Sequence, residues 1–142
     1  MKIHIITIGQ PKLLYAQQGW KEYWSRLGHY HQVRDTHIAD RQNDATHILS
    51  AAGISYKIAL TIDGRQFSSP ELASLLYKQA LEAREVSFII GGPTGLPEAV
   101  SMQADLEWSF GKLTFPHDLA MVILLEALYR ASTINAQHPY HK

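Results

Sequence analysis

The stretch VSFIIGGPTGLPEA, residues 86–99, decides the fold class of this chain. It begins with a β-branched and aromatic run that is typical of a buried strand. The run continues without a linker into Gly91, Gly92 and Gly95, and a short helix is expected at residues 97–104. A strand, a glycine turn and a helix in direct succession form the repeating unit of α/β proteins.

The rest of the chain repeats this alternation. Apolar runs predict strands at residues 3–8, 33–38, 56–62, 86–90 and 106–110. Apolar residues at helical spacing predict helices at residues 13–27, 45–52, 70–83, 97–104 and 118–132. We therefore expect an α/β fold with a mostly parallel sheet, in which ligands bind at the carboxyl ends of the strands.

Three element boundaries carry local signals. Ser69 stands before Pro70, and an acidic residue follows, which predicts Ser69 as the helix N-cap and Pro70 as the first helical residue. Asp118 is expected to cap the last helix. The Asp-Gly pair at residues 63–64 predicts a turn that ends the third strand.

Size and composition favour one folded domain spanning residues 1–142. The chain is 46% hydrophobic and 18% charged, and it has no cysteine for disulfide or thiolate chemistry. No signal peptide or membrane-spanning stretch is recognisable, so we expect a cytoplasmic protein with no membrane partner. The 13 basic and 13 acidic residues cancel, which counts against nucleic-acid binding through bulk charge but leaves room for a local RNA-binding patch.

The glycine turn favours a nucleoside or amino-acid ligand over a phosphate. Glycine allows positive φ and close approach of the backbone to a ligand. Leu96 and Pro97 stand where a phosphate-binding P-loop needs lysine and a hydroxyl residue, and Pro93 lacks the N–H that would face a pyrophosphate. The alternative is a tight connection between strand and helix that binds nothing.

The segment FGKLTFPH, residues 110–117, is unusual for a loop because it combines large apolar residues with glycine and proline. A purine ring needs apolar walls and a few backbone polar groups at its edge, and this segment supplies both. The alternative is a buried strand followed by a capped helix.

Four motifs, read together, identify a family. They are IIGGPTG at residues 89–95, LTFPH at 113–117, EALYRA at 126–131 and HPYHK at 138–142. They resemble the small SPOUT-class methyltransferases, which use S-adenosylmethionine (SAM) to methylate N3 of a pseudouridine in 23S ribosomal RNA. Weaker matches extend the resemblance over nearly the whole chain. It implies a single SPOUT domain with a C-terminal trefoil knot, in a homodimer whose active sites are each completed by the partner chain.

The resemblance also implies the residues that bind SAM. Leu60 would form a wall of the pocket, and Gly91 and Gly92 would let the backbone approach the cofactor. The adenine would be wrapped by Phe110, Gly111, Lys112, Leu113, Thr114 and Phe115. The implied partner is 23S rRNA within the ribosome, rather than DNA.

The last predicted helix supports a dimer independently. Its apolar residues occupy nearly all of its faces, and a helix that is apolar all round must be buried all round. In a chain of this size a subunit interface would bury it; a central position in a monomer is the alternative.

Methylation at N3 of pseudouridine requires the loss of an imide proton, so the site needs a general base or a group that stabilises an anion. Histidine titrates near neutral pH and suits the base role, whereas arginine only stabilises negative charge. The candidates are His117, Arg130, His138, Tyr140 and His141.

These candidates have plainer interpretations. Glu126 and Arg130 are four residues apart and can simply stabilise a helix. Histidines near a terminus are often only solvated. The histidines at 117, 138 and 141 are possible zinc ligands, but their spacing differs from the helical zinc motif and Pro139 blocks such a helix, so we expect no metal.

The chain is shorter than is usual in the family it resembles, and the gap falls within residues 38–52. Family members carry a loop rich in lysine and glycine there, whereas Arg41 is the only Lys or Arg in this stretch. If that loop binds the ribosome, this protein binds the ribosome differently. The sequence favours a 23S rRNA methyltransferase, with a SPOUT-like enzyme for another RNA such as tRNA, or an inactive ribosome-binding module, as alternatives.

Overall fold

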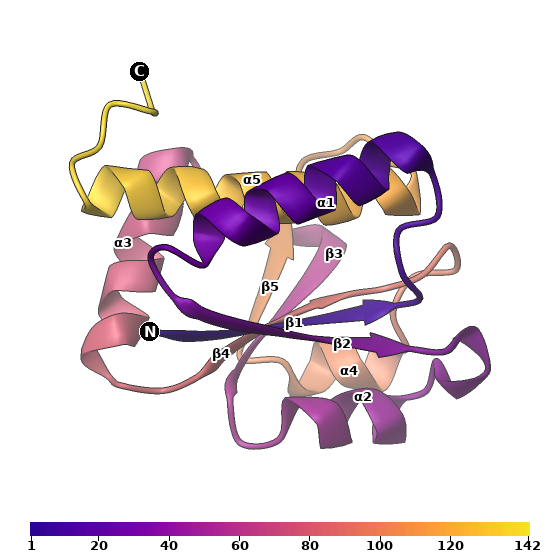
Figure 1. Cartoon of the computed structure of the whole chain (residues 1–142). Coiled ribbons are helices and arrows are strands. Elements are labelled where there is room, and N and C mark those ends of the chain that lie inside the picture. Colours follow the sequence, from indigo (N-terminus) through magenta and orange to yellow (C-terminus); the bar gives the residue numbers. More distant parts are fainter.

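The computed structural model describes all residues, Met1 to Lys142, and contains one five-stranded sheet between two layers of helices (Figure 1). The strand order is β2-β1-β4-β3-β5, and all neighbouring strands are parallel. The predicted α/β class with a parallel sheet is therefore confirmed. The strands are β1 (Lys2–Ile8), β2 (Gln32–Ile38), β3 (Tyr56–Gln66), β4 (Val86–Ile90) and β5 (Leu106–Ser109).

Helices α1, α3 and α5 cover one face of the sheet, while α2 and α4 cover the other (Figure 1). Their bounds agree with the sequence prediction to within a few residues. The helices are α1 (Leu14–Leu27), α2 (Ala45–Ala52), α3 (Ser69–Leu81), α4 (Glu98–Gln103) and α5 (His117–Asn135), and a 3-10 turn covers Asp40–Gln42. None of them is long and apolar enough to cross a membrane.

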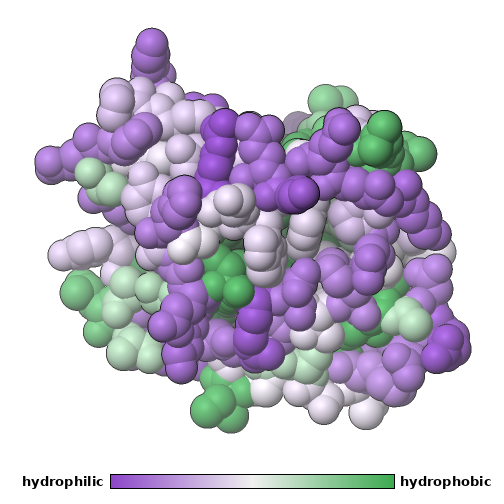
Figure 2. Space-filling model, viewed as in Figure 1, coloured by the Kyte–Doolittle hydropathy of each residue, from purple (hydrophilic) through white to green (hydrophobic).

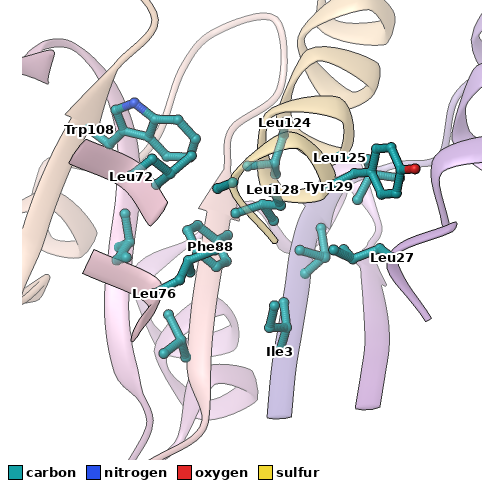
Figure 3. Packing of buried hydrophobic residues seen from close by; sticks show 14 of the residues in the cluster. Ile3, Leu27, Leu72, Leu76, Phe88, Trp108, Leu124, Leu125, Leu128 and Tyr129 are labelled. Atoms are coloured by element: carbon teal, nitrogen blue, oxygen red, sulfur yellow. The ribbon is translucent and has the colours of Figure 1, made fainter. Parts of the chain in front are cut away.

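Two apolar clusters join these layers. In the larger one, Phe88 of β4 packs with Leu76 of α3 and Leu128 of α5 (Figure 3). In the smaller one, Ile89 of β4 packs with Ile48 of α2 on the opposite face. Because helices cover both faces, all five residues of β4 are buried. This explains why four of its five residues are apolar without alternation, and the fifth, Ser87, is hydrogen-bonded to the Ser55 hydroxyl at 2.6 Å.

The third strand does not end where its Asp-Gly pair predicts. β3 continues to Gln66, and its pairing with β5 shifts register between Leu60 and Arg65. Gly64 lies in this bulge, where a Cβ would stand 2.7 Å from the backbone nitrogen of Trp108. Glycine at this position therefore allows two backbones to approach closely, and the predicted chain reversal is wrong.

Two predicted helix caps are also wrong. Ser68, not Ser69, caps α3, because its hydroxyl accepts the Glu71 N–H at 3.2 Å. Asp118 lies in the first turn of α5, which follows Pro116, and does not cap that helix. Instead the Asp118 carboxylate binds the start of α1, which the sequence pattern had no means of indicating.

Helix α5 packs between α1 and α3 and runs past the predicted end to Asn135. It approaches α1 closely, since a side chain at Gly19 would lie 3.0 Å from Val122. The single chain thus buries much of this apolar helix, as expected if the helix is central in a monomer. Several of its large side chains stay only half-buried, however; these are Leu119, Val122 and Ile123.

Candidate functional site

A cavity of about 230 Å³ lies at the carboxyl ends of β4 and β5 and at the bulge of β3. Open parallel sheets bind ligands at this edge. Its walls come from residues 60–62 of β3, the glycine turn after β4, the 110–117 segment and the first turn of α5. Most of the residues implied as SAM-binding line it, namely Leu60, Gly91, Gly92, Phe110, Gly111, Leu113, Thr114 and Phe115.

Lys112 is exposed and is not among the residues that line the cavity. Conversely, several apolar residues that the sequence prediction did not include do line it. They are Ile62, Ile90, Leu96, Trp108 and Ala120. Ile90 and Trp108 lie at the ends of β4 and β5, where the carboxyl-end rule would have found them, whereas the other three lie within β3, in the loop before α4 and in α5.

The glycines of the turn serve the packing of the chain itself. Gly95 donates its N–H to the Gly92 carbonyl at 2.9 Å and has a φ of 81°, which glycine adopts without strain. The resulting turn folds back onto Gly91, where a Cβ would lie 2.6 Å from the carbonyl carbon of Gly95. Glycine at 91 is therefore required even without a ligand, although both Gly91 and Gly92 line the cavity.

Aromatic side chains form one wall of the cavity. Trp108 and Phe110 meet edge to face with ring centroids 5.0 Å apart, and Phe115 lies beyond Phe110 at 6.4 Å. Leu113 is 74% exposed and Ile62 is 62% exposed, although both line the cavity. Apolar surface of this kind is what a planar nucleobase would cover.

Thr61 adds a polar group at the same place. It lines the cavity, and its hydroxyl oxygen is shielded from solvent without any hydrogen-bond partner. Most buried hydroxyls form a hydrogen bond, so the unpaired Thr61 hydroxyl is free to form one with a ligand. Apolar walls, glycine backbone and a spare hydroxyl together fit the nucleoside cofactor that the sequence implies.

His117 is the one catalytic candidate that lines the cavity. Its Nε2 lies 2.7 Å from the carbonyl oxygen of Ile8. Because a carbonyl only accepts hydrogen bonds, Nε2 must carry the proton, and this leaves the lone pair on Nδ1. The ring therefore anchors α5 to the end of β1 and still offers one acceptor.

The other candidates gather at the far end of α5. Glu126 Oε1 accepts hydrogen bonds from Arg130 Nε at 3.0 Å and Nη2 at 2.7 Å, and from the Tyr140 hydroxyl at 3.1 Å. Arg130 Nη1 donates to His141 Nδ1 at 3.3 Å. His138 is exposed and accepts the backbone N–H of Tyr140 at 3.2 Å.

These contacts fix the charges of the cluster. Hydrogen bonding to Glu126 raises the pKa of Arg130, so the guanidinium stays charged. Burial is the largest cause that raises the pKa of Tyr140, and hydrogen bonding to Tyr23 and then to Glu126 adds to it. Tyr140 is thus held as a neutral donor and is unsuited to be a base at neutral pH. No group of three His, Cys, Asp or Glu side chains is placed to hold a metal ion.

One chain does not bring all the candidates together. His117 begins α5 and Arg130 lies 13 residues further along, which is about 20 Å at the rise of an α-helix. The C-terminal tail leaves α5 at the end away from the cavity (Figure 1). The cavity and the tail cluster are therefore separate within a single copy.

Comparison with known proteins shows the family. The family model described as "Predicted SPOUT methyltransferase" matches residues 1–141. The chain belongs to the SPOUT methyltransferase family. A relative in Deinococcus radiodurans, named "Ribosomal RNA large subunit methyltransferase H", is 50% identical over 145 residues that cover 100% of this chain and 99% of the relative. One of the same name in Deinococcus deserti is 48% identical and covered in full.

A relative of that name in Bifidobacterium adolescentis is 38% identical, and its alignment spans 162 positions against the 142 residues of this SPOUT chain. The shorter length noted in the sequence is thus a difference from that relative. Among solved structures, a probable methylase family protein of Haemophilus influenzae has a TM-score of 0.63 at 10% identity, over 99% of this chain and 70% of that one. A probable methyltransferase of Bordetella pertussis has a TM-score of 0.58 at 14% identity, over 92% and 95%. These two likenesses support the fold.

Proposed function

We propose that this SPOUT methyltransferase transfers a methyl group from SAM to N3 of a pseudouridine in 23S rRNA of the large ribosomal subunit. The observation that carries the proposal is the cavity at the strand ends, in a chain similar over its full length to proteins named for large-subunit rRNA methylation. The trefoil knot typical of the family stays a prediction.

SAM would occupy this cavity. Leu60, Phe110 and Phe115 would enclose the adenine between apolar walls, and Leu113 would lose its exposure by covering one face. The Gly91 backbone and the Thr61 hydroxyl would meet polar groups of the cofactor. When bound, SAM supplies the electrophilic methyl group.

Residues of the chain would accept the N3 proton and stabilise the negative charge on the base. The N3 proton must leave before or during transfer, and negative charge develops on the base. Arg130 carries a permanent positive charge that would stabilise this anion, and Tyr140 would stack on or donate to the base as a neutral hydroxyl. His117 has a ring nitrogen with no hydrogen-bond partner and is suited to accept a proton; His138 and His141 have their Nδ1 atoms engaged by N–H donors.

We further infer that the enzyme works as a homodimer, in which the tail of one copy reaches the cavity of the other. The separation of about 20 Å between the cavity and the tail along α5 motivates this inference. Leu13 and Leu14, at the start of α1, are 56% and 68% exposed, and large side chains of α5 are half-buried. Figure 2 shows apolar surface gathered over this end of α1 and α5. A second copy would cover it.

The test is transfer of a labelled methyl group from SAM to purified ribosomes, with ribosomes that lack pseudouridine in their 23S rRNA as the control. Label only in the pseudouridine-containing rRNA is the expected result. Label in both preparations would point to another nucleotide. Label in neither would reject ribosomal pseudouridine as the substrate, and calorimetric titration with SAM would then separate an enzyme for another RNA from a module that binds no cofactor.

A further inference from the structure

The carboxylate of Glu126 joins two distant parts of the chain. Its Oε1 accepts two hydrogen bonds from Arg130, one turn along α5, and a third from Tyr140, 14 residues away in the tail. The backbone N–H groups of residues 136–138 donate to carbonyls of the last turn of α5, whereas residues 139 and 142 are exposed. Beyond residue 138 the tail therefore meets α5 through Tyr140 and His141, and Glu126 accepts from Tyr140 and holds Arg130, the partner of His141.

An ordinary helical ion pair does not account for this arrangement. Glu22 and Arg26 form a pair of the same spacing on α1, with one hydrogen bond at 2.7 Å and side chains 57% and 40% exposed. Exposed pairs of this kind contribute little to the stability of a helix. Glu126 and Arg130 are 27% and 31% exposed, and their pair also engages the tail.

Further side-chain contacts of the tail involve the same residues. The guanidinium of Arg130 lies over the Tyr140 ring, 4.8 Å from its centroid. Tyr140 also meets Tyr129 edge to face at 4.7 Å. Because Arg130 holds His141 in turn, fixing Arg130 and Tyr140 fixes the next residue of the tail as well.

We propose that Glu126 is a positioning residue, which sets the geometry of Arg130, Tyr140 and His141 for the substrate without touching the substrate itself. The inference rests on the proposed function, which places Arg130 and Tyr140 at the target nucleotide. A carboxylate that accepts three donors from two segments holds both in one arrangement, and misplacement of catalytic groups by about 1 Å is enough to lower a rate roughly 100-fold.

The experiment compares E126Q with the matched variant E22Q and with wild type. E126Q keeps the shape of the side chain but removes its charge, so Arg130 loses its ionic partner. We expect kcat for methyl transfer to fall roughly 10- to 100-fold. The KM for SAM should stay unchanged, because the cavity lies at the other end of α5. E22Q should behave as wild type in both respects.

A second readout follows the tail without using activity. NMR signals of the Tyr140 ring, identified by comparison with Y140F, should move toward unfolded-chain values in E126Q, because the ring leaves Tyr129 and the guanidinium of Arg130. Unchanged Tyr140 signals, or an unchanged kcat in a folded E126Q, would overturn the proposal. If wild type itself fails to methylate ribosomes, the proposed function falls, while shifted Tyr140 signals would still support the anchoring of the tail by Glu126.

Discussion

Asp118 holds Leu13: the carboxylate Oδ2 at the start of α5 accepts the backbone N–H of Leu13 at 2.6 Å. The same oxygen accepts the N–H of Lys12 at 2.9 Å. The neighbouring His117 binds the Ile8 carbonyl, so two consecutive side chains fasten the loop between β1 and α1 to the first turn of α5. This loop borders the cavity side of the molecule, and its fastening stabilises the wall that α5 contributes.

We expect D118A to lower the free energy of unfolding by about 1–3 kcal/mol, because two backbone N–H groups lose a charged acceptor in a buried place. D118N keeps one acceptor oxygen and should lose less. Urea unfolding followed by circular dichroism measures both variants. If D118A unfolds at the same urea concentration as wild type, the clamp contributes nothing to stability.

Leu113 offers a test of the adenine wall that leaves the fold intact. Its side chain is 74% exposed, so L113A should unfold like wild type, but the variant should bind SAM about tenfold more weakly, because the ligand no longer buries that side chain. Leu81 of α3, which is 70% exposed and does not line the cavity, provides the control variant L81A. Isothermal titration measures the SAM affinity of each variant. Equal affinity in L113A, L81A and wild type would contradict the role of Leu113 as a wall of the adenine site.

The unpaired hydroxyl of Thr61 predicts opposite effects on folding and on binding. T61V removes the hydroxyl at constant shape, so the ligand-free protein should be as stable as wild type or more stable, by up to about 1 kcal/mol. SAM affinity should fall roughly five- to tenfold, since the bound cofactor would lose one hydrogen bond. T61S, which keeps the hydroxyl, should bind nearly as wild type. Equal SAM affinity of T61V and wild type would show that the cofactor does not use this group.

His31 predicts a loss of stability in acid. Burial, and secondly the N-terminal amine, lowers its pKa from 6.5 to about 4. Between these values the unfolded chain binds more protons than the native protein, so this contribution to stability is present above pH 6.5 and is lost as the pH falls toward 4. The loss is on the order of 2 kcal/mol once partial exposure is allowed for.

The check is urea unfolding at a series of pH values for wild type and H31Q. Glutamine keeps a neutral polar group near Ser132, whose hydroxyl lies 2.8 Å from His31 Nε2. Glu85 also loses stabilising interactions in acid, because hydrogen bonding to Arg34 lowers its pKa, but it does so equally in both proteins. The difference between the two curves therefore isolates His31, and parallel curves would argue against a role for it.

Much of the fold was predictable because it depends on local patterns. The largely apolar, non-alternating run of β4 indicates burial on both faces, and the structure encloses it between α3 and α5 on one side and α2 and α4 on the other. The alternation of elements predicts a parallel sheet, and parallel sheets place ligands at the carboxyl ends of their strands. The family resemblance further implies that Leu60, Gly91 and Phe110 share one site, and these residues line one cavity.

The errors have a common physical cause. Aspartate is a residue type that often caps helices, which is why the sequence predicts a cap at Asp118. Its actual partners lie 105 and 106 residues away and are brought to it by the packing of α1 against α5. The Asp-Gly pair at 63–64 has the composition of a turn, but β5 lies alongside and continues the strand through a bulge. Local propensity is overruled where a distant segment offers better hydrogen bonds.

The sequence by itself determined the α/β class, the family and most of the residues around the cavity, because these follow from burial periodicity and from motifs of a few adjacent residues. Only the tertiary structure decided which groups meet. It brings the Tyr140 hydroxyl to the Glu126 carboxylate and the His117 ring to the Ile8 carbonyl. It also places the cavity and the tail at opposite ends of α5. Such contacts depend on directions and distances in space, which spacing along a chain does not encode.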